Sequence, residues 1–227
     1  MNNQLALLQL ADSFFPSGSF TLSHGLESLV RQKQITNAEE FATFLEILLA
    51  NKIGSCDLVA LIHAYRGSQD NNFALIQLAD EQLYCQTPIE LNRQIQQKSG
   101  RALLMVAEET WDSPQLKLLQ TKTAAKEIHC LHPIIFAVVA QTAGIDCRNT
   151  AIGFLHSYVT GLLGAAIRLN VIGHLQGQKI LLALSNDIEF AYEKARCLSL
   201  DEMWTCTPTI DLAQMQHQKL KMRLFAS

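Results

Sequence analysis

Charged side chains are scarce in this chain. Only 17% of its 227 residues are Asp, Glu, Lys or Arg, whereas 48% are hydrophobic, and the formal net charge is −3. Because no dense basic face is available to neutralise phosphates, the composition argues against a nucleic-acid-binding protein. The apolar residues predict either an unusually well-filled core or a surface that contacts another protein.

Paired cysteines are also missing. The six cysteines are widely scattered and none forms a C-x-x-C pair, so neither a zinc knuckle nor a thioredoxin-type site is indicated. We interpret them as small buried thiols of a reducing cytosol. The first ten residues, MNNQLALLQL, contain no basic segment of the kind that opens a secretory signal. These features together predict a cytoplasmic protein.

The motifs of common catalytic centres are absent as well. No G-x-S-x-G elbow occurs, and Ser23 beside His24 does not make a triad because adjacent residues of a helix diverge. Gly173, Gly177 and Lys179 lack the P-loop spacing, and no Ser or Thr follows the lysine. We therefore expect no catalytic residue and no nucleotide hydrolysis by this chain itself.

Alternating strand patterns are rare, whereas helix-start signals recur. The candidate helix starts are Thr36 with Glu39, Thr87 with Pro88 and Glu90, Ser113 with Pro114, and His132 with Pro133. Residues 179–184 are the best strand candidate, but they read equally well as the start of a helix that runs to about Cys197. Without a repeat or linker, the sequence predicts one all-α domain over residues 1–227, a bundle of roughly ten helices.

Residues 151–167 contain no Asp, Glu, Lys or Arg. A bilayer span needs ~20 predominantly apolar residues, whereas this run has 17 and includes polar side chains. A buried core helix explains the run better, so we expect no contact with membranes. Gly153, Ser157 and Gly161 place small side chains along one side of this helix, which suits close packing within the chain or a dimer seam.

His129, Cys130 and His132 are the only grouped candidates for transition-metal ligands. No carboxylate lies close by in the sequence and no fourth ligand is evident, which favours an ordinary structural cluster over a metal site. We therefore assign no metal ligand. The alternative is an all-α metal-binding enzyme that uses these three residues.

A short loop near the start of the chain is unusually aromatic. Residues 12–20 contain three phenylalanines, together with Pro16, which fixes φ, and Gly18, which permits positive φ. Such a loop either fills the protein's own core or presents anchors to a partner. The sequence leaves both alternatives open.

The run LLQLADSFFPSGSFTLSHGLE, residues 7–27, resembles the amino-terminal signature of the urease accessory protein UreF family. The matching residues are Leu10, Asp12, Ser13, Pro16, Gly18, Phe20, Ser23, Gly25, Leu26 and Glu27. Two later stretches are similar to the same family, through Arg168, Leu169, Gly173 and Gln178, and through Asp211, His217, Arg223, Leu224, Phe225 and Ser227. The likeness covers nearly the full length in the right order.

The resemblance implies an adaptor rather than an enzyme. Proteins of this family bridge UreD (also called UreH) and the GTPase UreG on apo-urease, and the assembly places nickel in the active site. By that resemblance the chain is a scaffold and modulator of the GTPase, and it forms a homodimer. It binds no cofactor tightly, since the assembled complex handles nickel and another chain hydrolyses GTP.

The resemblance also implies two contact segments, residues 1–27 and residues 208–227. The residues that carry over as partner-binding are Pro16, Gly18, Phe20, Ser23, Gly25, Leu26, Glu27, Arg168, His217, Arg223, Leu224 and Phe225. The chain departs from the family pattern at Thr21, Leu22 and Gln218, so roles tied to those positions do not transfer.

Three local expectations concern these segments. Ser23 is read as the N-cap of the helix that contains residues 25–31. From Asp211 the ending predicts a helix in which Ala213, His217, Leu220 and Leu224 share one face. Arg168 directly follows the uncharged run and needs a partner, which is either an acid such as Glu27 or Asp12 or a residue of another protein.

Overall fold

Helices form the regular structure of the described residues, which in this computed structural model are 3–12, 15–16, 22–217 and 223–225. No strand occurs among them, which confirms the predicted all-α class. The elements are α1 (Asn3–Ala11), α2 (Leu26–Arg31), α3 (Ala38–Leu48), the π-helix η2 (Leu49–Asp57), α4 (Leu58–Gln69), α5 (Phe73–Cys85), α6 (Glu90–Thr110), α7 (Pro114–Ala124), α8 (His132–Thr142), α9 (Cys147–Arg168), α10 (His174–Ala183), α11 (Ser185–Ala195), the short 3₁₀ helix η3 (Leu200–Glu202) and α12 (Pro208–His217).

Two of the four expected helix starts are confirmed. The Ser113 side chain accepts a hydrogen bond from the Gln115 N–H at 3.3 Å, and Pro114 is the first residue of α7. Helix α8 begins at His132, with Pro133 in its first turn. In both cases proline occupies a position whose N–H would have no partner within the helix.

The other two starts are wrong by one or more residues. Asn37, not Thr36, caps α3, because its side-chain oxygen accepts from the N–H groups of Glu39 and Glu40 at 3.0 Å. Thr87 does not cap α6, since its hydroxyl donates back to the Leu83 carbonyl at 2.8 Å. Helix α6 begins at Glu90 instead.

The expected single helix from residue 179 to about Cys197 is also wrong, because α10 ends at Ala183 and α11 begins at Ser185. Leu184 lies between them with ψ near 0° and is buried. The Ser185 hydroxyl donates to the Leu182 carbonyl at 2.8 Å. The bend therefore buries Leu184 and turns α11 onto η2 and α9.

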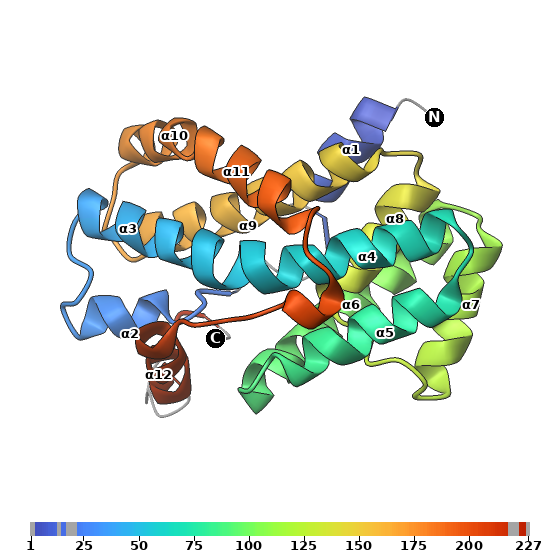
Figure 1. Ribbon diagram of the computed structural model, residues 1–227. Helices are drawn as coiled ribbons and strands as arrows, with labels where there is room; N and C mark the ends of the chain where they lie inside the picture. Colours follow the sequence, from blue (N-terminus) through green and yellow to red (C-terminus); the bar gives the residue numbers. More distant parts are fainter. Residues whose placement is uncertain (1–2, 13–14, 17–21, 218–222, 226–227) are drawn as a thin grey trace.

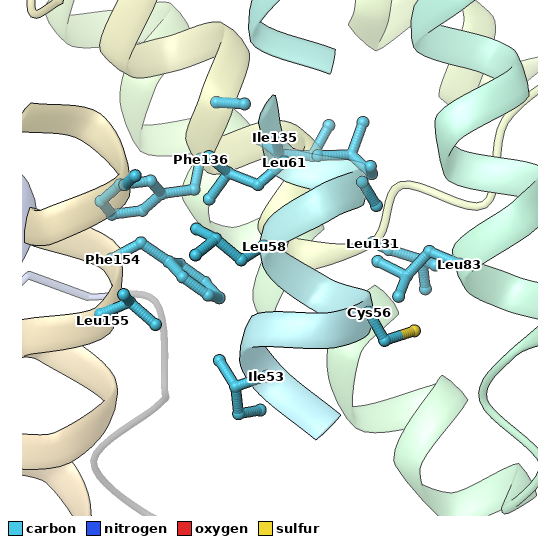
Figure 2. Close-up of a cluster of buried hydrophobic side chains, with 14 of the residues drawn as sticks. Ile53, Cys56, Leu58, Leu61, Leu83, Leu131, Ile135, Phe136, Phe154 and Leu155 are labelled. Carbon is cyan, nitrogen blue, oxygen red and sulfur yellow. The ribbon is translucent and has the colours of Figure 1, made fainter. Parts of the chain in front are cut away.

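The core is centred on α4, which lies between α5, α8 and α9 (Figure 1). Leu58 and Leu61 are fully buried, and Figure 2 shows side chains of α4, α8 and α9 meeting around them. The Tyr65 hydroxyl donates to the Ile145 carbonyl at 2.9 Å, so its polar end is satisfied inside the bundle. Burial on nearly every side makes α4 the central helix.

The uncharged run forms most of α9. By length and composition α9 would pass as a membrane span, but 56% of its most apolar window is buried inside the protein. A Cβ at Gly153 would lie 2.5 Å from the Leu7 side chain, so this glycine lets α1 pack closely on α9. Packing within the chain is therefore confirmed at Gly153, whereas a Cβ at Gly161 would meet no atom within 4 Å.

The six cysteines are free thiols. Cys56 and Cys130 are buried as expected, but Cys85, Cys197 and Cys206 are exposed, which corrects the expectation of uniformly buried thiols. Cys85 is the last residue of α5 and Cys197 follows α11. Positions at helix ends face solvent more readily than positions on a packed helix face.

Candidate functional site

The two contact segments, far apart in the sequence, meet in space. Helix α12 packs against α2, and Figure 1 shows the two helices side by side. A Cβ at Gly25 would lie 3.0 Å from the Gln214 side chain and 3.2 Å from the Ile210 carbonyl oxygen. Gly25 also has φ +87°, a conformation that side chains disfavour, so both the turn and the helix contact require glycine here.

Glu27 joins the two segments. Its fully buried carboxylate accepts a hydrogen bond from His217 Nε2 at 2.9 Å and from the Leu224 backbone N–H at 3.0 Å. The Phe225 N–H donates to it at 3.3 Å, and Arg31 pairs with it at 2.8 Å. A carboxylate can only accept, so His217 holds a proton on Nε2 in this contact. One side chain of the signature therefore fixes both α12 and the tail.

The electrostatics of Glu27 follow from these contacts. Burial by itself raises the pKa of the Glu27 carboxyl, but hydrogen bonds from His217, Leu224 and Arg31 outweigh burial and hold the pKa below its usual value. The ionised form is thus the one that the site stabilises. A buried carboxylate with several donors is a strong, specific anchor because each donor would otherwise lose its partner.

Arg168 adds a second contact to the tail. Its guanidinium lies 4.3 Å from the centre of the Phe225 ring, and its Nε donates to the Gly164 carbonyl at 3.2 Å. Phe225 is only 5% exposed, whereas Arg168 is exposed, so the ring is the buried partner of this cation–π contact. Arg168 thus holds the tail from the side of α9.

Helix α12 has further contacts with the bundle. Lys52 Nζ lies 3.6 Å from an Asp211 carboxylate oxygen, and the Asn92 side-chain amide donates to Gln214. Before α12, the Trp204 N–H donates to the Ser55 carbonyl at 3.2 Å and the Cys206 N–H to the Asn51 carbonyl at 2.9 Å. Both of these backbone hydrogen bonds end on η2, where the irregular turn leaves backbone carbonyls free to accept.

The structure sorts the predicted partner-binding residues by accessibility. Ser23, Gly25, Leu26, Glu27, His217 and Phe225 are buried, whereas Pro16, Arg168, Arg223 and Leu224 are exposed, Leu224 by 67%. Gly18 and Phe20 lie outside the described residues, and of the aromatic loop Phe15 is buried. Contact with a partner stays a prediction for all of them, and the exposed group offers the accessible atoms.

Two local expectations are corrected here. Ser23 is not the N-cap of α2, since Gly25 occupies that position and no side chain caps it. Leu224 does not share a buried helix face with Ala213 and His217, because α12 ends at His217 in the described residues and Leu224 lies in a bend. Leu220, the other expected member of that face, lies outside the described residues.

The three candidate metal ligands point to different environments. His129 pairs with Glu81 at 2.8 Å and stacks on Tyr84, and Cys130 is buried with the pKa of its thiol raised to about 11, chiefly by burial. His132 packs on Phe136 and Phe154 instead. Across the described parts of the chain, no three His, Cys, Asp or Glu side chains gather closely enough to hold a metal ion.

The loop that carries these residues has a structural explanation. The buried Asp80 carboxylate accepts the His129 N–H, and the Leu131 N–H at 3.0 Å, which fixes the turn around Cys130 at positive φ. Burial raises the pKa of Asp80, and the backbone donors partly offset that effect. The cluster thus connects α7 to α8 and offers no support for the metal-enzyme alternative.

The comparisons with known proteins identify the family. A sequence profile of UreF matches residues 35–185 of this chain. The urease accessory protein UreF of Trichodesmium erythraeum is 52% identical over 227 residues, which cover all of this chain and 98% of that protein. The chain belongs to the UreF family. Proteins of the same name from Bacillus sp. and Rhodopseudomonas palustris are 30% and 31% identical over 228 and 214 residues, covering 100% and 94% of this chain and 100% and 88% of theirs.

In this UreF-family chain the matched profile includes Arg168 but neither Glu27 nor His217. The full-length relatives extend over both segments. The junction between α2 and the tail therefore lies within the region shared with named urease accessory proteins.

Sequence reasoning missed several residues of the junction. Lys52 and Asn92 come from distant segments and hold α12 through its residues Asp211 and Gln214. Of these residues only Gln214 has a usable signal, since it lies on the same buried face of α12 as the expected Ala213 and His217. Nothing in the local pattern around Lys52 or Asn92 indicates a contact with the last helix.

Proposed function

We propose that this UreF-family protein is a non-enzymatic scaffold of urease maturation. It bridges UreD/UreH and the GTPase UreG on apo-urease, supports GTP-dependent nickel insertion and modulates the GTPase. It works in the cytoplasm as a homodimer, with no tightly bound cofactor, because the assembled complex handles the nickel. Family membership over the full chain supports this function.

The observation that carries the proposal is the Glu27 junction. A scaffold needs a contact segment held in one conformation, because ordering a free segment on binding costs conformational entropy. Here Glu27, His217 and Arg168 hold the tail so that Arg223 and Leu224 face outward while Phe225 is buried. Exposed Arg and Leu beside a buried aromatic anchor match the composition of an interface.

The test is co-purification of the tagged full-length chain with UreD/UreH and UreG. A chain that ends at Met222 loses Arg223, Leu224 and Phe225, and we expect it to lose the assembly. Leu224→Asp leaves the buried contacts in place and should weaken the assembly at least tenfold, roughly the effect of one interface hot spot. Leu118→Asp, at an exposed position of α7, is the matched control and should have no effect.

Two outcomes separate the parts of the proposal. If the shortened chain still assembles fully, the tail is not part of the contact surface, but the scaffold role stands. Failure of the full-length chain to join UreD/UreH and UreG would contradict the scaffold role itself.

A further inference from the structure

A pocket of about 80 Å³ lies between the turn before α2, η2, α6, the start of α8 and α9. Apolar side chains such as Phe154 and Leu162 form much of its wall. Polar side chains from each of these elements also line it. No part of the proposed scaffold function uses this pocket.

Two polar atoms in the pocket wall have no partner. The Tyr158 hydroxyl and Gln96 Oε1 are buried, and neither forms a hydrogen bond within the described chain. Buried polar groups are normally satisfied, because an unpaired one keeps its full desolvation cost. A molecule inside the pocket would satisfy both.

Two histidines line the same pocket. The His24 ring lies 4.6 Å from the Tyr158 ring and the His132 ring 6.1 Å from the Phe154 ring, yet neither imidazole forms a hydrogen bond to any described residue. Burial, with smaller effects of Lys52 and His132, lowers the pKa of His24 to about 3, and burial lowers that of His132 to about 4. Both rings are therefore neutral near pH 7, and each offers one donor and one acceptor.

The two charged side chains that line the pocket have opposite signs. Lys52 supplies one positive charge and Asp57 one negative charge, and Asp57 accepts a hydrogen bond from Gln96 Nε2 at 3.1 Å. Burial raises the pKa of Asp57 to about 6, whereas Lys52 acts in the opposite direction. Lys52 also lies 3.6 Å from Asp211, which does not line the pocket. Among the lining residues the formal charges of Lys52 and Asp57 cancel, so a neutral molecule fits better than an ion.

We propose that this pocket binds a small neutral molecule with both an N–H donor and a carbonyl acceptor, a primary amide of about four non-hydrogen atoms. Its volume is roughly half the ~150 Å³ of an engineered cavity that holds benzene. The amide oxygen accepts from the Tyr158 hydroxyl, and the amide N–H donates to Gln96 Oε1 or to an imidazole nitrogen. Apolar walls around these groups suit the small carbon frame.

The experiment is an NMR titration of the full-length chain with acetamide, with acetone as the control ligand of the same shape that lacks N–H donors. We expect saturable binding of acetamide and at least tenfold weaker binding of acetone. Tyr158→Phe keeps the ring on His24 and removes only the hydroxyl, so the acetamide affinity should fall roughly tenfold. Tyr84→Phe, which leaves the pocket intact, should bind like the unaltered chain.

A filling variant tests the location. Gly161 lines the pocket and a Cβ there meets no atom within 4 Å, so Gly161→Leu projects a side chain into the space and should abolish binding. Gly161→Met is a second filling variant with a more adaptable side chain, and Gly177→Ala controls for the loss of a helical glycine elsewhere. Circular dichroism checks that each variant is folded.

Three results would overturn the proposal. They are an absence of saturable acetamide binding by the full-length chain, equal affinities for acetamide and acetone, and unchanged binding by a folded Gly161→Leu or Gly161→Met chain. None of these results bears on the scaffold function, because assembly with UreD/UreH and UreG is measured separately.

Discussion

Glu27 lies where the amino-terminal signature meets the carboxy-terminal tail, and its carboxylate receives donors from both. The contacts with His217, Leu224 and Phe225 span 190 or more positions of sequence. A buried carboxylate that binds several donors contributes more than a surface pair, because no water replaces the lost partners. At the scale of single residues, Glu27 is the position on which the tail depends most.

Glu27→Gln should lower the free energy of unfolding by about 2 kcal/mol, since the neutral amide satisfies fewer of the buried donors. Chemical denaturation followed by tryptophan fluorescence measures the change. Glu90→Gln removes an exposed carboxylate that pairs with Arg93 and should change stability little. Equal effects of the two substitutions would contradict the anchoring role of Glu27.

The stability difference between the unaltered chain and Glu27→Gln should also depend on pH. The pKa of Glu27 is lowered in the folded chain, so its stabilising contribution is present above the usual value of 4.5 and is lost as the pH falls below it through the folded pKa. The stability difference between the unaltered chain and Glu27→Gln should therefore shrink below pH 4.5. A difference that stays constant down to pH 3 would show that the charge of Glu27 is not responsible.

At the scale of elements, close approaches at glycine decide how the helices pack. A Cβ at Gly100 in α6 would lie 2.0 Å from the Cys130 carbonyl oxygen, which is backbone held by the Asp80 turn. The loop before α8 therefore rests directly on α6. Gly161 in α9 faces open space instead, so two helical glycines with the same local propensity have opposite roles.

This contrast predicts that a Gly→Ala substitution has opposite effects on stability at the two positions. Gly100→Ala should destabilise the chain by about 3 kcal/mol, because backbone atoms must move to admit the methyl group. Gly161→Ala should stabilise it by about 1 kcal/mol through helix propensity alone. Thermal unfolding of both variants measures the changes. Similar melting temperatures for the two would show that α6 and residues 129–131 are not in contact as described.

At the scale of the whole molecule, apolar surface is left on the outside of the bundle. In α10 only Gly177 is buried, and Leu175 and Leu182 are 82% and 76% exposed, about two turns apart on the same side. Exposed apolar side chains that lie together indicate a contact surface. The homodimer implied by the family resemblance needs such a surface, and α10 offers one.

We therefore expect the purified chain to sediment as a dimer of the 25.3 kDa protomer. Leu175→Asp combined with Leu182→Asp should shift it to the monomer, because two buried charges would face each other across the contact. Leu78→Asp, at an exposed position of α5, is the control. A doubly substituted chain that still sediments as a dimer would exclude α10 from the interface.

The sequence alone determined the all-α class, because helical periodicity and capping residues act over a few neighbouring positions. Ser113 with Pro114 and the start of α8 at His132 illustrate this local coding. At the start of α3 the capping-box pattern indicated Thr36, whereas the neighbouring Asn37 is the cap. The family resemblance singled out Glu27, His217 and Arg168 as partner-binding residues, and their contact with a partner stays a prediction.

Tertiary structure decided what those residues contact. The pairing of Glu27 with His217, the cation–π contact of Arg168 with Phe225 and the burial of Phe225 depend on the path of the whole chain between them. The pocket beside Tyr158 likewise brings together elements from distant parts of the sequence. Long-range contacts and burial arise from the summed packing of all the helices, so no local pattern encodes them.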